Sequence, residues 1–177
     1  MVLIQMKFNQ HLTLLPKFDE RFQSYIEKPI HDLTYKEDLS KEEVYLASFN
    51  EDDKVIDLDE LEIVLAKKYK RCRNCSMDLS FVISDEDEKA KEVVLVEYRF
   101  NYSIPSKLVK SDLDNKVKFS KIYTQFIYQI PVHKKKYFVF KTNKVPEFER
   151  RLRRMDPSCS PDYIACSIKD ISEKFFR

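Results

Sequence analysis

Three ionisable residues near the middle of the chain are the best candidates for chemistry. Asp78 lies at the start of an expected strand, residues 77–84, and Glu97 and Arg99 lie in the second half of another, residues 92–102. The acidic, lysine-punctuated stretch between the strands is typical of a hairpin connection, and closing that hairpin brings Asp78 across from Glu97 and Arg99. Two carboxylates and a guanidinium at one end of an apolar sheet are costly unless they are paired, exposed or bound to a metal.

The strand at residues 92–102 begins apolar on both faces and becomes polar on one face towards its end. Side chains alternate along a strand, so one face carries Val94, Val96, Tyr98 and Phe100. The other face carries Val93 and Leu95, followed by Glu97, Arg99 and Asn101. Because both faces need cover, we expect an α/β fold in which this hairpin lies at the centre of a mixed sheet with helices on both sides.

The spacing of these residues, Asp78 followed by Glu97-Tyr98-Arg99, resembles the motif of the PD-(D/E)xK nuclease superfamily. The resemblance covers roughly residues 57 to 142 and implies the restriction-endonuclease-like fold, an α/β sandwich with a mixed central sheet flanked by helices. It further implies that Asp78 and Glu97 hold Mg²⁺ against a phosphodiester of DNA or RNA, with Glu60 as a weaker outer carboxylate candidate.

Two positions depart from the pattern of that superfamily. Arg99 stands where the superfamily has Lys, and Met77 stands where Pro often precedes the Asp. The Lys is thought to position or activate the attacking water, and an arginine, which is charged at any accessible pH, cannot take a proton from it. An arginine can still stabilise charge on a phosphoryl group.

Three interpretations of these residues therefore stay open. The protein is a metal-dependent nuclease, or it keeps the fold without the chemistry and binds nucleic acid or a protein partner, a second copy of itself included. In the third, Glu97 and Arg99 only form a surface ion pair at a strand end.

Composition predicts one folded domain without a strong overall charge. The chain has 177 residues, of which 43% are hydrophobic and 13% aromatic, as expected for a globular protein. We expect a helical N-terminal part at residues 1–56, a helix–strand–strand–helix–strand core at 57–142, and a closing part at 143–177. Charged residues make up 35% but nearly cancel to +2. Any nucleic-acid surface must therefore be a local patch.

The chain contains no glycine. Phosphate-cradling loops, dinucleotide-binding fingerprints and the nucleophile elbow of hydrolases need glycine where the backbone approaches a ligand or takes positive φ. These nucleotide-binding and hydrolase classes are therefore excluded.

The flanking segments predict the helices and strands that position the site. Asp57 is an N-cap candidate, with Glu60 three residues on, for a helix that reaches about residue 69. A second helix is expected to begin at Ser111 and to bury Leu113, Val117, Phe119, Ile122, Tyr123 and Phe126. Residues 136–142 read as a third strand, parallel to a hairpin strand because a helix crosses over between them. A last strand near residues 162–168 completes a sheet of about four strands, and no strand is recognised ahead of the one that bears Asp78.

Two basic runs near the C-terminal end form a possible phosphate-binding rim. A helix after Pro146 is expected to turn Phe148, Leu152 and Met155 inward. Its other sides carry Arg150, Arg151, Arg153 and Arg154, and the neighbouring strand begins with Lys134, Lys135 and Lys136. A solvated charged face is the alternative interpretation.

The cysteines favour free thiols over a metal centre. Cys72 and Cys75 have the spacing of a zinc-ligand pair, but Cys159 and Cys166 are separated by six residues rather than two to four. A structural zinc is not expected. No apolar segment approaches the length of a membrane span, so we expect a cytoplasmic protein that does not enter a membrane.

Overall fold

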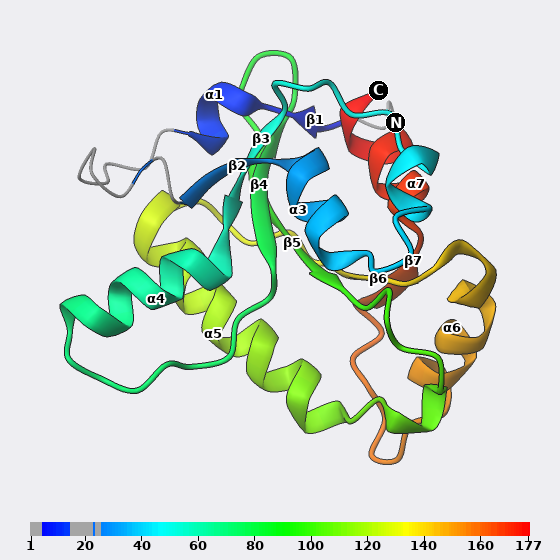
Figure 1. The fold of residues 1–177 in the computed structure, drawn as a ribbon. Coiled ribbons are helices and arrows are strands. Elements are labelled where there is room, and N and C mark those ends of the chain that lie inside the picture. The colour runs from blue at the N-terminus through cyan, green and yellow to red at the C-terminus, as the bar shows by residue number, and fades with distance from the viewer. Residues whose placement is uncertain (1–4, 15–22, 24–25) are drawn as a thin grey trace.

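The computed structural model describes residues 5–14, 23 and 26–177. In these ranges the chain forms a mixed α/β fold with a seven-stranded sheet and six α-helices (Figure 1). The strands are β1 (Lys7–Phe8), β2 (Glu27–Pro29), β3 (Lys54–Asp57), β4 (Leu79–Ser84), β5 (Lys91–Tyr98), β6 (Lys136–Val139) and β7 (Tyr163–Cys166). The helices are α1 (Gln10–Thr13), α3 (Ile30–Glu37), α4 (Leu58–Lys68), α5 (Lys110–Tyr128), α6 (Val145–Arg154) and α7 (Ile168–Ile171).

The sheet has more strands than the four or so expected. Its order is β2-β3-β4-β5-β6-β7, and β1 pairs with β4 beside this path. The additional strands β1, β2 and β3 are two to four residues long, too short to show an alternating pattern. Of the N-terminal part expected to be helical, residues 1–56, residues 1–4, 15–22 and 24–25 lie outside the described residues.

The central hairpin has the expected register. Strands β4 and β5 are antiparallel, with Leu79 opposite Val96 and Ser84 opposite Lys91. Extending this register by one residue places Asp78 opposite Glu97. The 19-residue helix α5 then crosses over the sheet, and β6 pairs with β5 in parallel, as predicted from the crossover.

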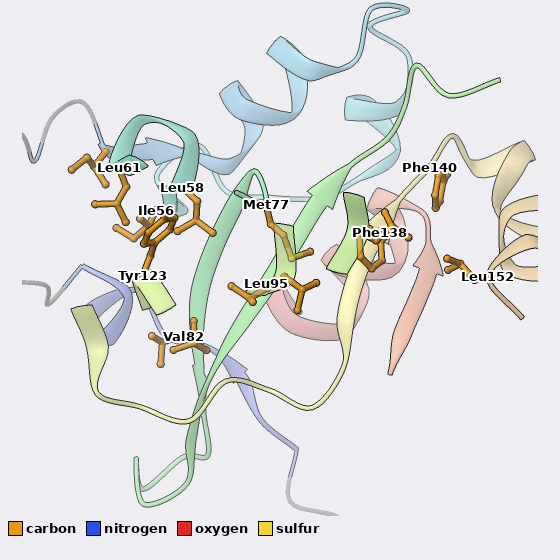
Figure 2. Close-up of a cluster of buried hydrophobic side chains, with 14 of the residues drawn as sticks. Ile56, Leu58, Leu61, Met77, Val82, Leu95, Tyr123, Phe138, Phe140 and Leu152 are labelled. Carbon is orange, nitrogen blue, oxygen red and sulfur yellow. The ribbon is translucent and has the colours of Figure 1, made fainter. Parts of the chain in front are cut away.

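Both faces of the hairpin are buried by helices. On one face, Val82, Val93 and Leu95 pack with apolar side chains of α4, α5 and α6. Figure 2 shows part of this cluster, in which Met77 and Leu95 lie between Leu58 and Phe138. The opposite face packs Val94, Val96 and Tyr98 against α3, α7 and the C-terminal turn Ser172–Phe176.

Two details of α5 differ from the sequence expectation. The helix begins at Lys110 with Val109 as its N-cap, so Ser111 is not the cap. Ile122 and Phe126 were expected to be buried but are 52% and 68% exposed. The inward positions belong instead to Ser120, whose hydroxyl accepts a hydrogen bond from the Met77 N–H, and to Thr124, which donates to the Ser120 carbonyl.

Left-handed backbone is adopted without glycine. Lys41, Lys70, Glu88 and Gln129 have φ between 50° and 58°, and Gln129 ends α5 in this conformation.

Among the described residues, no helix is both long and apolar enough to cross a membrane.

Packing on both faces of the sheet predicts matching losses of stability. Leu95→Ala on one face and Ile83→Ala on the other each remove a fully buried side chain, so each should lower the free energy of unfolding by about 2–5 kcal/mol. Ile104→Ala, at a side chain 45% exposed, should change it by less than about 0.5 kcal/mol. Urea unfolding measures all three variants, and a loss at only one face would contradict the two-sided core.

Candidate functional site

Asp78 and Glu97 lie side by side on one face of the sheet. Asp78 precedes β4, Glu97 is the second-last residue of β5, and the antiparallel register brings the two together. The carboxylate of Asp78 accepts a hydrogen bond from the Tyr98 N–H through Oδ2, which fixes its orientation. The Glu97 side chain is only 2% exposed, whereas that of Asp78 is 17% exposed. Asp78 is therefore the carboxylate that solvent can reach.

Lys116 of α5 joins the two carboxylates. Its Nζ is 2.8 Å from Glu97 Oε1, 3.0 Å from Glu97 Oε2 and 4.0 Å from Asp78 Oδ1. Lys116 is not among the site residues predicted from the sequence. The only indication of Lys116 in the sequence is that it follows Leu113 by three positions, which places it on the inward side of the helix.

Arg99 is held beside Glu97 on its other side. Its Nε is 2.9 Å from Glu97 Oε1 but makes no hydrogen bond in the described structure, so the contact is electrostatic. Its guanidinium donates to the Tyr102 hydroxyl at 2.6 Å and lies 4.7 Å from the centre of that ring. The Glu97–Arg99 pair is therefore buried and not a surface ion pair.

Burial and charge act in opposite directions on these groups. Burial raises the pKa of Asp78 well above its ordinary value, and the charge of Glu97 raises it further, against Lys116. Burial also raises the pKa of Glu97, although Lys116 and Arg99 oppose the shift. For Lys116, burial alone would lower the pKa, but Glu97 and Asp78 outweigh it and raise the pKa. The ammonium therefore stays protonated in this arrangement.

The third acidic group near the pair is Asp59 rather than Glu60. The charge of Asp59 raises the pKa of both Asp78 and Glu97, and Ser76 donates to its Oδ1 at 2.6 Å. Glu60 instead uses its backbone N–H to cap α4 through Asp57, as the sequence predicted. The sequence alone did not tell which acidic residue of this first turn faces the sheet.

A small acidic cavity adjoins Asp78. It holds about 10 Å³, room for one water-sized particle, and is lined by Leu33, Lys36, Glu37, Asp57, Asp59, Asp78 and Tyr98. In the described part of the chain, no three His, Cys, Asp or Glu side chains gather closely enough to hold a metal ion. Mg²⁺, however, often takes only one or two carboxylates and completes its shell with water and substrate phosphate. Asp78 and Glu97 supply carboxylate oxygens of this kind, and both oxygens of Glu97 lie within 3.0 Å of Lys116 Nζ.

The predicted basic rim does not present all of its charges to solvent. Lys136 is buried and donates through Nζ to the His133 carbonyl at 2.9 Å. Arg151 donates to the Leu108 carbonyl at 3.2 Å, and Arg153 lies 3.4 Å from Glu149. Lys134, Lys135, Arg150, Arg153 and Arg154 remain exposed. The run at residues 134–136 leads into β6, in which Phe138 is the partner of Glu97, so the run ends two residues before the level of Glu97.

The cysteines do not form one centre. Cys72 and Cys75 are exposed, Cys159 is half-buried, Cys166 is buried, and all four are free thiols.

No protein-family model, curated protein or solved structure matches the chain. The chemistry of the site must therefore be inferred from its geometry and charges.

The raised pKa of Asp78 predicts a pH-dependent stability difference. Between the ordinary pKa of an aspartate and its raised value in the folded protein, the folded state binds more protons than the unfolded state, so this carboxyl makes stability fall as pH rises. Asp78→Asn removes that contribution and keeps an oxygen for the Tyr98 N–H. The variant should gain stability relative to wild type as pH rises from about 4 to about 7. Denaturant unfolding across this range measures the gain, and a difference independent of pH would contradict the assignment.

Proposed function

We propose that the protein is a metal-dependent phosphodiesterase acting on nucleic acid, with Asp78 and Glu97 as ligands of a divalent cation such as Mg²⁺. The observation that carries the proposal is the position of Lys116, whose ammonium lies within 4.0 Å of both carboxylates. Two acids and a lysine are the side chains that the PD-(D/E)xK motif combines. Here the lysine comes from α5 and not from the strand position held by Arg99.

The order of the strands supports the same fold family. Strand β3 stands antiparallel to β4, ahead of the Asp-bearing strand, where the sequence analysis recognised no strand. Strands β3, β4 and β5 are successive antiparallel neighbours, and α5 then leads to β6 in parallel with β5. We therefore infer a restriction-endonuclease-like core, which the chain extends with β2 on one side and β7 on the other.

Each residue of the cluster has a distinct part in the proposed chemistry. Asp78 and Glu97 would hold the divalent cation, which when bound would supply Lewis-acid stabilisation of phosphoryl charge and would lower the pKa of bound water. Lys116, protonated beside two carboxylates, donates hydrogen bonds to a phosphoryl oxygen or orients the attacking water. Arg99 is fixed by Tyr102, and its charge opposes the rise in the pKa of Glu97.

One observation favours the alternative of a non-catalytic nucleic-acid- or protein-binding module with the same fold. Both Glu97 oxygens are already bonded by Lys116, and the side chain is 2% exposed. Metal binding requires Lys116 to move from Glu97 towards the phosphate. In the alternative, the cluster is a buried ion pair that fixes α5 on the sheet.

Alanine substitutions separate the two functions. Asp78→Ala and Glu97→Ala each remove a proposed metal ligand and should abolish Mg²⁺-dependent cleavage of plasmid DNA or RNA, while Glu60→Ala should leave most of it. A gel assay with Mg²⁺, Mn²⁺ and EDTA arms measures cleavage. Full activity in both ligand variants, or an inactive wild type with every metal, would leave the binding module as the function.

Substitutions of the two cations test which of them the chemistry uses. Lys116→Met should reduce cleavage by about 10²-fold or more, since it removes a donor aimed at developing charge. Arg99→Lys restores the side chain that the superfamily has on the strand. Because Lys116 already supplies an ammonium, we expect Arg99→Lys to give no gain and a small loss of stability from the lost Tyr102 contact. Higher activity in Arg99→Lys than in wild type would show that Lys116 does not fill this role.

A further inference from the structure

The last two residues of α4 and the start of the connection to β4 carry a dense run of basic residues. Five of the seven residues from 67 to 73 are Lys or Arg, and none is acidic. Lys67, Lys68, Lys70 and Arg73 are exposed, and so is Tyr69 between them. No ion pair joins Lys67, Lys70 or Arg73 to an acidic side chain among the described residues. We name this segment, residues 67–73, the basic loop.

A buried carboxylate anchors the basic loop. Glu62 of α4 is fully buried and accepts both arms of the Arg71 guanidinium, at 2.6 and 2.8 Å. It also accepts the Asn74 N–H at 2.6 Å. The loop leaves α4 through Lys70 in left-handed backbone, and the Arg71 N–H closes the turn on the Ala66 carbonyl. Arg71 is thus held by the anchor, and the Lys68 ammonium lies 5.6 Å from the centre of the Tyr69 ring. Lys67, Lys70 and Arg73 are exposed.

The loop continues along α5 into the candidate site. The Asn74 side chain donates to the Tyr123 hydroxyl at 3.0 Å, and the Met77 N–H donates to the Ser120 hydroxyl at 2.7 Å. The next residue is Asp78. Figure 1 shows this loop passing beside α5 before it enters β4. Tyr123 and Lys116 are seven residues apart on α5, which corresponds to a rise of about 10 Å along the helix axis.

From this arrangement we propose that the basic loop is the surface that holds the phosphate backbone of a nucleic-acid strand and leads it to Asp78, Glu97 and Lys116. The inference rests on the proposed function for the identity of the ligand. Exposed, unpaired lysines and arginine bind phosphates and release counterions, and Tyr69 offers a face for stacking a base. This surface replaces the C-terminal rim as the main contact, because α6 carries acidic residues among its arginines and pairs Arg153 with Glu149.

Two variants of equal charge change test the surface. Lys67→Gln/Lys70→Gln/Arg73→Gln removes three loop charges, and Arg150→Gln/Arg153→Gln/Arg154→Gln removes three from α6. Fluorescence anisotropy with a short labelled oligonucleotide of mixed sequence, single-stranded and duplex, measures affinity over a range of salt. The titrations contain EDTA, so neither metal binding nor cleavage enters, and a failed nuclease assay leaves this result interpretable. Thermal unfolding checks that both variants are folded.

The loop variant should bind at least about tenfold more weakly at low salt, and its slope of log K against log salt should be shallower by about two to three. The α6 variant should bind within about twofold of wild type, because acidic residues lie among the arginines of α6 and Glu149 pairs with Arg153. An equal or larger loss in the α6 variant would overturn the proposal, as would a wild type that does not bind either oligonucleotide.

Vesicles of phosphatidylcholine and phosphatidylserine serve as a second probe. Loop-dependent binding to vesicles without binding to oligonucleotides would assign the surface to lipid and also overturn it.

Discussion

The contact between Lys116 and Glu97 is the interaction on which the rest of the site depends. Glu97 lies on the face of β5 that also carries Val93 and Leu95, so folding takes its carboxylate out of water. A buried charge without a partner would destabilise the fold by several kcal/mol. Lys116 and Arg99 supply the opposite charges. Lys116 reaches Glu97 only if α5 has a particular crossing angle to the strands and a particular rotation about its own axis. The polar end of the strand therefore orients the helix that covers it.

This requirement explains why the inward face of α5 is partly polar. Lys116, Ser120 and Thr124 follow one another at intervals of four residues, and Ser120 bonds the backbone just before Asp78. A helix that serves a charged strand end and a loop backbone cannot use the same positions for apolar packing. Its apolar residues Ile122 and Phe126 consequently face outward.

Local patterns predicted the elements that have strong local signals. The alternation around Val94 and Leu95 gave the central hairpin and its two buried faces, and Asp57 with Glu60 gave the start of α4. Strand β3 was missed because four residues show no period, and it forms through pairing with β2 and β4. Lys116 was missed because its contact with Glu97 depends on how the helix crosses the strands. That crossing decides which helical residue meets a given strand. No local pattern encodes that geometry, and the same holds for Asp59 against Glu60.

Buried carboxylates join distant segments of the chain at several places. Glu62 holds the basic loop to α4, and Glu97 holds α5 to the sheet. Glu43 accepts hydrogen bonds from the backbone N–H and the hydroxyl of Thr142, which follows β6. For Glu62, burial alone would raise the pKa, but Arg71 and the Asn74 N–H outweigh it and lower the pKa, so its charge is satisfied. The pKa of Glu97 stays raised despite its partners. Of these two glutamates, Glu62 has the lowered pKa expected of a carboxylate whose charge is fully compensated. An added positive charge at the Asp78 end of the cluster would favour the ionised form of both site carboxylates, and the divalent cation in our proposal would supply such a charge.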